Sequence, residues 1–271
     1  MISDISIGQY YTGNSFLHKM DARMKFILVF ALLVFVFLCK SFFSLALMVA
    51  FTVFAVILSK VPLRMVLKSI KPLVIIILFT ALLNIFYTTG GRTYFEWHSL
   101  RLTEKGINTA IFMAVRILVL VVISSLLTYT TTPTMLTDAI ERLLSPLSVF
   151  HIKVHTLAMM MTLALRFIPT LIEEIERIMN AQKARGAELE TGGLIARSKA
   201  LVPVFVPLMV SSFRRAYELA FAMTCRCYTG GEGRTRMKQM KLKPRDLIAA
   251  VFVVIILAGV IVLNHFFEAV I

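Results

Sequence analysis

Residues 171–187 read LIEEIERIMNAQKARGA, an amphipathic segment that ends in one arginine between two small residues. Leu171 and Ile178 fall at helical spacing, and Arg185 follows Ile178 by the same interval. The arginine therefore continues the apolar stripe of the predicted helix instead of its charged face. Gly186 can adopt the left-handed backbone that ends a helix. The pattern predicts a helix whose last turn presents a guanidinium to a partner protein.

A second copy of this arrangement follows later in the chain. Residues 215–228 read RAYELAFAMTCRCY, in which Arg226 stands between Cys225 and Cys227. Its apolar stripe is less regular, because Arg215 falls on the same side of the predicted helix as Arg226. A single arginine near a helix end can simply be a cation that favours the carbonyl terminus. Two copies, each closing an amphipathic segment, favour a pair of docking sites.

Three stretches of the chain carry a resemblance to a known family. They are Ala184-Arg185-Gly186, Cys225-Arg226-Cys227 with the glycine-rich basic tail that follows it, and residues 15–25, SFLHKMDARMK. Together they resemble the transmembrane T component of energy-coupling factor (ECF) transporters, and the likeness spans nearly the whole chain. The cysteines replace the more usual alanine and glycine of the second motif but keep the neighbours of Arg226 small.

The resemblance implies partners for both arginines. In that family two X-Arg-X motifs end the coupling helices that dock onto a pair of ATPase subunits, of the EcfA and EcfA′ type. A separate membrane protein, the S component, captures a vitamin or a metal ion. The implied function is a scaffold that couples ATP hydrolysis by its partners to movement of the S component during micronutrient uptake.

The composition is that of an integral membrane protein. The 271 residues are 58% hydrophobic, include 21 phenylalanines and have a mean hydropathy of +0.83, which exceeds an ordinary soluble domain. The net charge of +14 fits an anionic membrane surface better than nucleic acid, because the basic residues stand between apolar runs without interleaved aromatic platforms. We expect a lipid bilayer as a partner and no nucleic acid.

Apolar runs predict about five transmembrane helices in an all-α membrane protein. Residues 26–58 would form a helix of about 50 Å, too long for a hydrocarbon core of roughly 30 Å, so two short spans meeting at residues 39–41 are expected. The other three spans are predicted at residues 73–87, 107–129 and 247–263, with residues 88–106 as a loop. Arg116, inside the fourth span, is interpreted as structural, paired with a backbone carbonyl or with Asn84.

Residues 131–246 are predicted to form a helical cytoplasmic coupling domain between the fourth and fifth spans. Two apolar runs in it, residues 157–165 and 201–210, look too short to cross a membrane. Prolines predict helix breaks near Pro133, Pro146 and Pro169. The expected divisions are a juxtamembrane segment at 1–25, four helices at 26–130, the coupling domain at 131–246, and the last helix with its tail at 247–271.

Four methionines of this domain are candidates for contact with the S component: Met159, Met160, Met161 and Met209. Flexible, polarizable thioethers suit surfaces that accept several partners. Packing in a hydrophobic core explains them equally well.

Basic residues predict the orientation in the membrane. Seven lie in short segments on the N-terminal side of the spans and four on the other side. The two groups are Lys19, Arg23, Lys25, Lys60, Arg64, Lys68 and Lys71, against Lys40, Arg92, Arg101 and Lys105. The positive-inside rule then places the N-terminus and residues 131–246 in the cytoplasm of a prokaryote and Ile271 outside the plasma membrane.

Several other chemistries are disfavoured. No Gly-Lys dipeptide occurs, so the chain lacks the phosphate-binding loop that its own ATP hydrolysis would need. No carboxylate falls inside a predicted span, which disfavours coupling to protons or Na⁺. Three cysteines make no disulfide framework, and a Cys-X-Cys pair alone is a weak metal signal; we read the thiols as reduced and facing cytoplasm or lipid. We expect no catalytic residue, no metal and no cofactor.

An intramembrane protease is the alternative function. His151 and His155 are spaced to share one helical face and could ligate zinc, while Glu173 and Glu174 with Arg177 could support hydrolysis. The zinc-protease pattern requires a glutamate directly after the first histidine, and an isoleucine stands there. The sequence therefore favours a transport scaffold that is not itself an enzyme.

Overall fold

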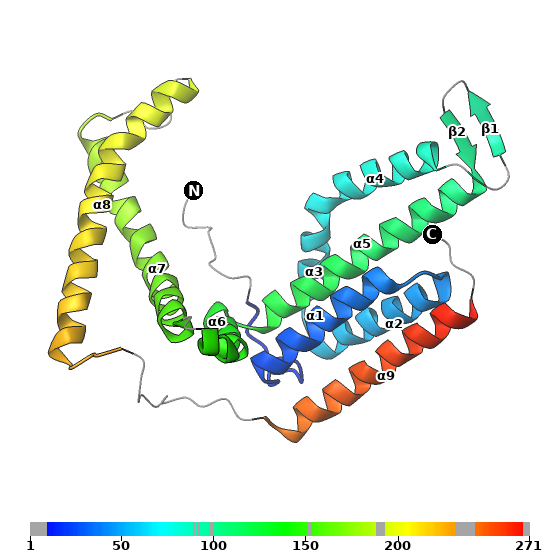
Figure 1. The fold of residues 1–271 in the computed structure, drawn as a ribbon. Coiled ribbons are helices and arrows are strands. Elements are labelled where there is room, and N and C mark those ends of the chain that lie inside the picture. The colour runs from blue at the N-terminus through cyan, green and yellow to red at the C-terminus, as the bar shows by residue number, and fades with distance from the viewer. Residues whose placement is uncertain are drawn as a thin grey trace. The chain divides into compact units, whose positions relative to one another are not determined.

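The computed structural model describes residues 10–88, 90, 93–97, 100–150, 153–187, 193–230 and 242–267. Within these ranges the chain is almost entirely helical (Figure 1). It divides into two compact units. The first, which we call the bundle unit, combines Gly8–Ala139 with Gln239–Ile271. The second, the arginine unit, combines Ile140–Lys238 with Met1–Ile7 and contains both arginine motifs.

The bundle unit is built from long apolar helices. They are α1 (Ala22–Leu38), α2 (Phe42–Ser59), α3 (Leu63–Ile70), α4 (Val74–Tyr87), α5 (Glu104–Thr130) and α9 (Pro244–Phe266), with a 3₁₀ turn Lys71–Leu73 between α3 and α4. The predicted pair of helices meeting at residues 39–41 is confirmed, because α1 ends before Cys39 and Ser41 caps α2. The Ser41 hydroxyl accepts the backbone N–H of Ser44 at 3.2 Å.

Four helices meet in the core of the bundle unit. Val36 of α1, Met48 of α2, Phe112 of α5 and Val260 of α9 are fully buried against one another. The outer faces remain apolar, as on α4, where Ile75 is 77% exposed. Such apolar surface is stable in lipid but not in water. The all-α membrane fold is therefore confirmed.

Five helices of the described ranges are long and apolar enough to cross a membrane. They are α2, the continuous Leu63–Tyr87 helix pair, α5, Val154–Ala184 and α9. The set differs from the prediction, because α1 has 17 residues, about 25 Å, and Val154–Ala184 takes its place. The run at 157–165 thus lies in a helix that is long and apolar enough to span, although the run by itself is too short.

Polar contacts define the two ends of the bundle unit. At the proximal end, the Lys25 ammonium donates to the carbonyl of Thr130 at 3.0 Å, and Asp246 accepts the backbone N–H of Asp21 at 2.9 Å. At the distal end, Asn264 accepts the backbone N–H of Lys40 at 3.0 Å. α1 and α9 therefore both start at the proximal end and finish at the distal end, as Figure 1 shows.

The segment predicted as a loop at 88–106 contains a β-hairpin. β1 (Thr93–Trp97) pairs antiparallel with β2 (Leu100–Thr103), and Trp97 lies opposite Leu100. β1 is rich in the aromatic and β-branched residues that favour extended backbone, which explains the difference. Thr103 then caps α5 by accepting the N–H of Gly106 at 3.1 Å.

The half-buried Arg116 and the buried Cys39 meet at the turn between α1 and α2. The Arg116 guanidinium donates to the carbonyl of Cys39 and lies over the ring of Phe112 at 4.7 Å. The prediction of a backbone carbonyl as partner is confirmed, whereas Asn84 donates to the carbonyl of Thr80 instead. Cys39 is fully buried. The expectation that its thiol faces the cytoplasm or lipid is therefore wrong.

Prolines break the helices of the arginine unit less often than predicted. The helices are α6 (Pro133–Leu144), which begins in the bundle unit, a 3₁₀ helix Ser145–Phe150, α7 (Val154–Ala184) and α8 (Leu194–Cys225). Pro133 starts α6 and Pro146 lies in the 3₁₀ helix, but α7 continues through Pro169. An interior proline removes one backbone hydrogen bond, a loss that a long helix packed against a neighbour can tolerate.

Candidate functional site

The candidate site is built on α7 and α8, which pack antiparallel. The Gln182 amide near the end of α7 donates to the carbonyl of Pro203 near the start of α8 at 3.3 Å. That carbonyl is free because Pro207 has no N–H to donate to it. At the opposite end of the pair, the Tyr228 hydroxyl donates to the sulfur of Met159 at 3.0 Å.

The first arginine motif ends α7 in a left-handed turn. Arg185 is the C-cap, and Gly186 follows with φ of +88°. The N–H of Gly186 donates to the carbonyl of Lys183, and the N–H of Ala187 donates to that of Gln182, both at 3.0 Å. This pair of bonds is the Schellman motif, which the glycine had predicted. Ala184, Arg185 and Gly186 are all exposed.

The second motif ends α8 in the same way. Arg226 is the C-cap, and the N–H of Cys227 donates to the carbonyl of Thr224 at 2.9 Å. The N–H of Tyr228 donates to the carbonyl of Met223 at 3.0 Å, which completes a second Schellman motif. Cys227 holds the left-handed position with φ of +57°, although it carries a side chain. Arg226 and both cysteines beside it are exposed.

The two arginines lie at opposite ends of the α7–α8 pair. Tyr228 contacts Met159, so Arg226 ends α8 beside the first turns of α7. Arg185 stands 26 residues after Met159, which is 185 minus 159, at the other end of the same helix. At 1.5 Å per residue the two C-cap positions are separated by roughly 35–40 Å along α7. This separation allows each arginine to contact a different partner surface.

The irregular stripe of the second motif has a structural explanation. Arg215 donates to a carboxylate oxygen of Glu174 on α7 at 2.9 Å, and Ser211 donates to the other oxygen at 3.3 Å. Arg215 therefore points into the helix pair. Leu219 and Met223, which share its stripe, are partly buried like Arg215. Arg226, past the end of this packed face, remains exposed.

The four candidate methionines are not brought together. Met159, Met160 and Met161 lie in the second turn of α7, near the Arg226 end of the pair. Met160 and Met161 are exposed, whereas Met159 is half-buried under Tyr228. Met209 lies on α8 next to the residues that contact the second half of α7, so it belongs to a different part of the pair.

The residues of the protease alternative are engaged elsewhere. Glu141 of α6 accepts from His155 at 3.0 Å, Glu174 pairs with Arg215, and Glu173 lies 3.9 Å from Arg177. His151 lies outside the described residues. No group of three metal-ligating side chains forms within the described ranges. The protease reading has no support in this geometry.

The N-terminal stretch at residues 15–25 organises the proximal end of the bundle unit. The His18 ring bridges the Ser15 hydroxyl at 2.6 Å and the carbonyl of Tyr11 at 2.9 Å. Asp21 is the N-cap of α1 and accepts both the backbone N–H and the guanidinium of Arg23. The order of residues in this motif is thus explained by capping.

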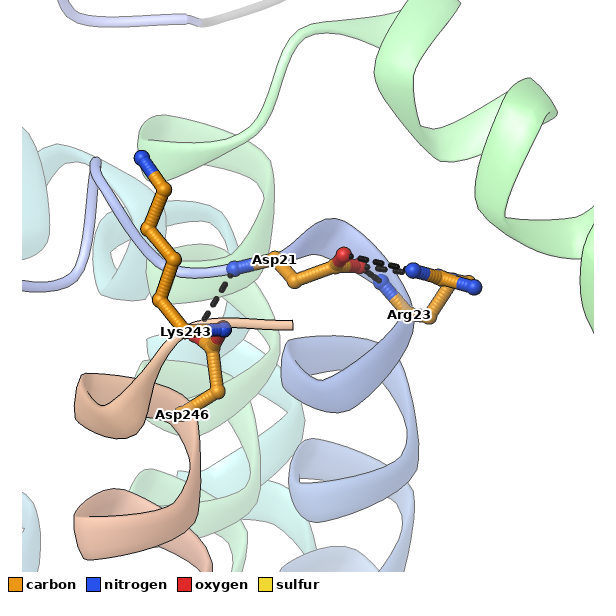
Figure 2. A network of polar contacts seen from close by, with 4 residues as sticks. All are labelled: Asp21, Arg23, Lys243 and Asp246. Carbon is orange, nitrogen blue, oxygen red and sulfur yellow. Dashed lines mark hydrogen bonds and ion pairs between the residues drawn. The ribbon is translucent and has the colours of Figure 1, made fainter. Parts of the chain in front are cut away.

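Sequence reasoning missed the carboxylate on which this end depends. Figure 2 shows Asp246 of α9 next to Asp21, and its two oxygens accept the backbone N–H groups of Asp21 and Lys243 at 2.9 and 2.8 Å. Asp246 is buried, with 2% of its surface exposed. An aspartate three residues into a helix that starts with proline is the signal that could have indicated this cap.

The surroundings shift the pKa values of two cations at the proximal end, Arg23 and Lys25. The side-chain hydrogen bond with Asp21 raises the pKa of Arg23 above its ordinary value. Lys25 lies in the first turn of α1, before the apolar run begins at Phe26. Burial lowers the pKa of Lys25 to about 8, against the opposing charge of Asp246. Lys25 is thus a buried cation whose charged form is disfavoured by burial and favoured by Asp246.

Comparison with known proteins identifies a family model and several relatives that match this chain. Residues 13–237 match the family model described as cobalt transport protein, CbiQ. The chain is 48% identical over 267 residues to the energy-coupling factor transporter transmembrane protein EcfT of Ruminiclostridium cellulolyticum, across 98% of this chain and 100% of that one. Proteins of the same name from Clostridium kluyveri and Bacillus subtilis are 51% and 42% identical over 251 and 258 residues. These alignments cover 92% and 95% of this chain, and 93% and 97% of those proteins.

Proposed function

This chain belongs to the EcfT family of energy-coupling factor transporter transmembrane proteins, and on that premise we propose that Arg185 and Arg226 each dock into a separate ATPase subunit. Each exposed guanidinium offers a planar fork of donors that suits a carboxylate on the partner. The ATPases supply the chemistry, and this chain transmits their movement to an S component that carries a vitamin or a metal ion.

The observation that carries the proposal is the placement of the two arginines. They occupy equivalent C-cap positions, yet stand at opposite ends of the α7–α8 pair. A separation of roughly 35–40 Å suits two subunits that move relative to each other better than two contacts on one subunit. A rigid helix pair between the two docking points converts closure of the ATPases into displacement of the pair.

Orientation in the membrane is part of the same proposal. We place the proximal end of the bundle unit and the coupling domain, residues 131–246, in the cytoplasm, where the ATPases find their nucleotide. The support is the charge distribution, since Lys25, Lys60 and Arg64 lie at or beside the proximal end and Lys40 lies at the distal end. The apolar first half of α7, with Met160 and Met161 exposed, then offers a surface for the S component or lipid.

Co-purification of the ATPases with full-length variants tests the proposal. Losing one partner of a desolvated ion pair costs about 3–5 kcal/mol, so Arg185→Ala and Arg226→Ala should each release one ATPase, and the double variant both. Crosslinking identifies which ATPase each single variant loses. The matched control is Arg177→Ala, because Arg177 is an exposed α7 arginine whose contact with Glu173 is 3.9 Å long. Wild-type retention and uptake in the double variant would refute the proposal.

A further inference from the structure

Three side chains join α7 and α8 at the centre of the helix pair, and we call them the Glu174 clamp. One carboxylate oxygen of Glu174 on α7 accepts from the Arg215 guanidinium at 2.9 Å, and the other accepts from the Ser211 hydroxyl at 3.3 Å. Glu174 and Arg215 are half-buried, with 20% and 34% of their side chains exposed. A charge-assisted hydrogen bond that is partly withheld from water is stronger than the same bond in bulk solvent.

The clamp lies at the same interval from both arginine motifs. Glu174 precedes Arg185 by 11 residues (185 minus 174), and Arg215 precedes Arg226 by 11 residues (226 minus 215). This interval is about 16 Å of helix and within about 20° of three full turns, so each clamp residue shares a helix face with the arginine of its own helix. The clamp therefore stands at the base of two arms of equal length, each of which ends in an exposed arginine.

The centre of the pair lacks a buried apolar core in the part of the chain that the structure describes. Among the described residues, α7 has no buried side chain after Ala158, and α8 has none after Val204. Two further polar contacts between the helices, at Pro203 and at Met159, lie near the ends of the pair. Because hydrophobic contact is non-directional and hydrogen bonds are directional, the clamp fixes how α7 lies against α8 at the centre.

We propose that Glu174 and Arg215 are positioning residues for energy coupling, because they fix α7 against α8 so that displacement of one arginine motif displaces the other. This inference rests on the proposed docking of Arg185 and Arg226 into two ATPases. Movement passes between distant sites through rigid helices and the ion pairs that connect them. A helix pair that turns freely at its centre would instead absorb the movement of one ATPase. Loss of the clamp therefore separates ATP hydrolysis from uptake while both ATPases stay bound.

Spin-label distances in the full chain, in nanodiscs and without ATPases, test the clamp itself. After replacement of the three native cysteines, labels at Asn180→Cys on α7 and Ala222→Cys on α8 report the arrangement of the helices, since both positions are exposed. We expect one narrow distance distribution in this parent chain. Glu174→Gln should broaden it, because the amide keeps an acceptor for Ser211 but removes the charge that holds Arg215. The exchanged pair, Glu174→Arg with Arg215→Glu, should restore the narrow distribution.

Transport by the complete complex in proteoliposomes tests the role in coupling. The substrate is the vitamin or metal ion that co-purifies with the S component, identified by mass spectrometry. Glu174→Gln and Arg215→Ala should retain both ATPases and their hydrolysis of ATP, while uptake per ATP hydrolysed falls about tenfold, within the usual range of coupling between two sites. The exchanged pair should recover most of the uptake, which a general loss of stability does not predict.

The matched controls are the neighbouring charges outside the clamp. Glu173, whose side chain is 67% exposed, precedes Glu174, and the exposed Arg214 precedes Arg215. Glu173→Gln and Arg214→Ala remove the same charges one position away, so both should match wild type in spin-label distance and in uptake per ATP.

The two measurements separate the clamp from the docking of the ATPases. A distance distribution that neither Glu174→Gln nor Arg215→Ala broadens would overturn the clamp, whether or not the arginine motifs dock. A broadened distribution with wild-type uptake per ATP, or release of the ATPases by Glu174→Gln, would overturn its role in coupling. Retention of both ATPases after loss of Arg185 and Arg226 would refute the docking, and the spin-label result would still show whether the clamp holds the helices.

Discussion

Gly186 and Cys227 occupy the same left-handed position in two helix endings with the same hydrogen bonds, one after Arg185 and the other after Arg226. Their φ angles are +88° and +57°. Glycine adopts this backbone without strain, whereas a side chain adds about 1–2 kcal/mol. The two arginines are thus presented alike, but the second ending is the strained one.

Cys227→Gly should stabilise the end of α8. Removing the side chain relieves about 1 kcal/mol of left-handed strain, so hydrogen exchange of the Cys227 and Tyr228 amides should slow several-fold. The reciprocal change, Gly186→Cys, should speed exchange at the end of α7 by a similar factor, because a Cβ there meets nothing within 4 Å and only backbone strain is added. Unchanged exchange in both variants would show that neither turn limits its helix end.

Arg185→Lys and Arg226→Lys should restore ATPase binding only in part. An ammonium keeps the charge but cannot reproduce the two parallel hydrogen bonds of a guanidinium. We expect each variant to bind its ATPase about tenfold more weakly than wild type and more tightly than the corresponding alanine variant. Titration of purified ATPase onto the chain in nanodiscs measures both. Lysine variants that bind as tightly as wild type would indicate a purely electrostatic contact.

Lys40 and Lys60 should face opposite sides of the membrane, because both are exposed and stand at the two ends of α2. After Cys39→Ala, Cys225→Ser and Cys227→Ser, an impermeant maleimide should label Lys40→Cys on intact cells and Lys60→Cys only after permeabilisation. Glu218→Cys, exposed on α8, reports on the arginine unit and should behave like Lys60→Cys. The reverse pattern at Lys40 and Lys60 would invert the orientation that the basic residues predict.

Met160→Glu and Met161→Glu should lower retention of the S component, since a carboxylate is costly on an apolar contact surface. Both side chains are exposed, so neither change disturbs the packing of α7 on α8. Met209→Glu is the comparison at a half-buried site in another part of the helix pair. Retention of the ATPase bound through Arg226 is measured in parallel, because that motif ends near the same turns of α7. If every variant keeps the S component, the surface of this chain that contacts the S component lies elsewhere, for example on the bundle unit.

Local sequence pattern was sufficient for much of this protein. The apolar runs predicted α1, α2, α4, α5 and α9, including the turn at residues 39–41, but not α3, whose basic residues do not form an apolar run. Whether a helix face is buried or faces lipid depends mainly on residue type. The small residue after Arg185 predicted a left-handed helix ending, since glycine meets no steric penalty there. The left-handed backbone of Cys227 was harder to predict, because a residue with a side chain disfavours it. The same two hydrogen bonds nevertheless hold Cys227 in this conformation.

The tertiary structure alone decided how these pieces combine. Pro169 was predicted to break its helix, yet α7 continues through it. α8 likewise continues through Pro207, and the Pro203 carbonyl that Pro207 leaves without a donor accepts from Gln182 of the neighbouring helix. Asp246 joins the start of α9 to Asp21, 225 residues earlier in the chain. Such contacts depend on which helices become neighbours, and no window of local sequence contains that information. The antiparallel pairing of α7 with α8 likewise sets the two arginines at opposite ends, because a helix hairpin places its two C-terminal ends far apart.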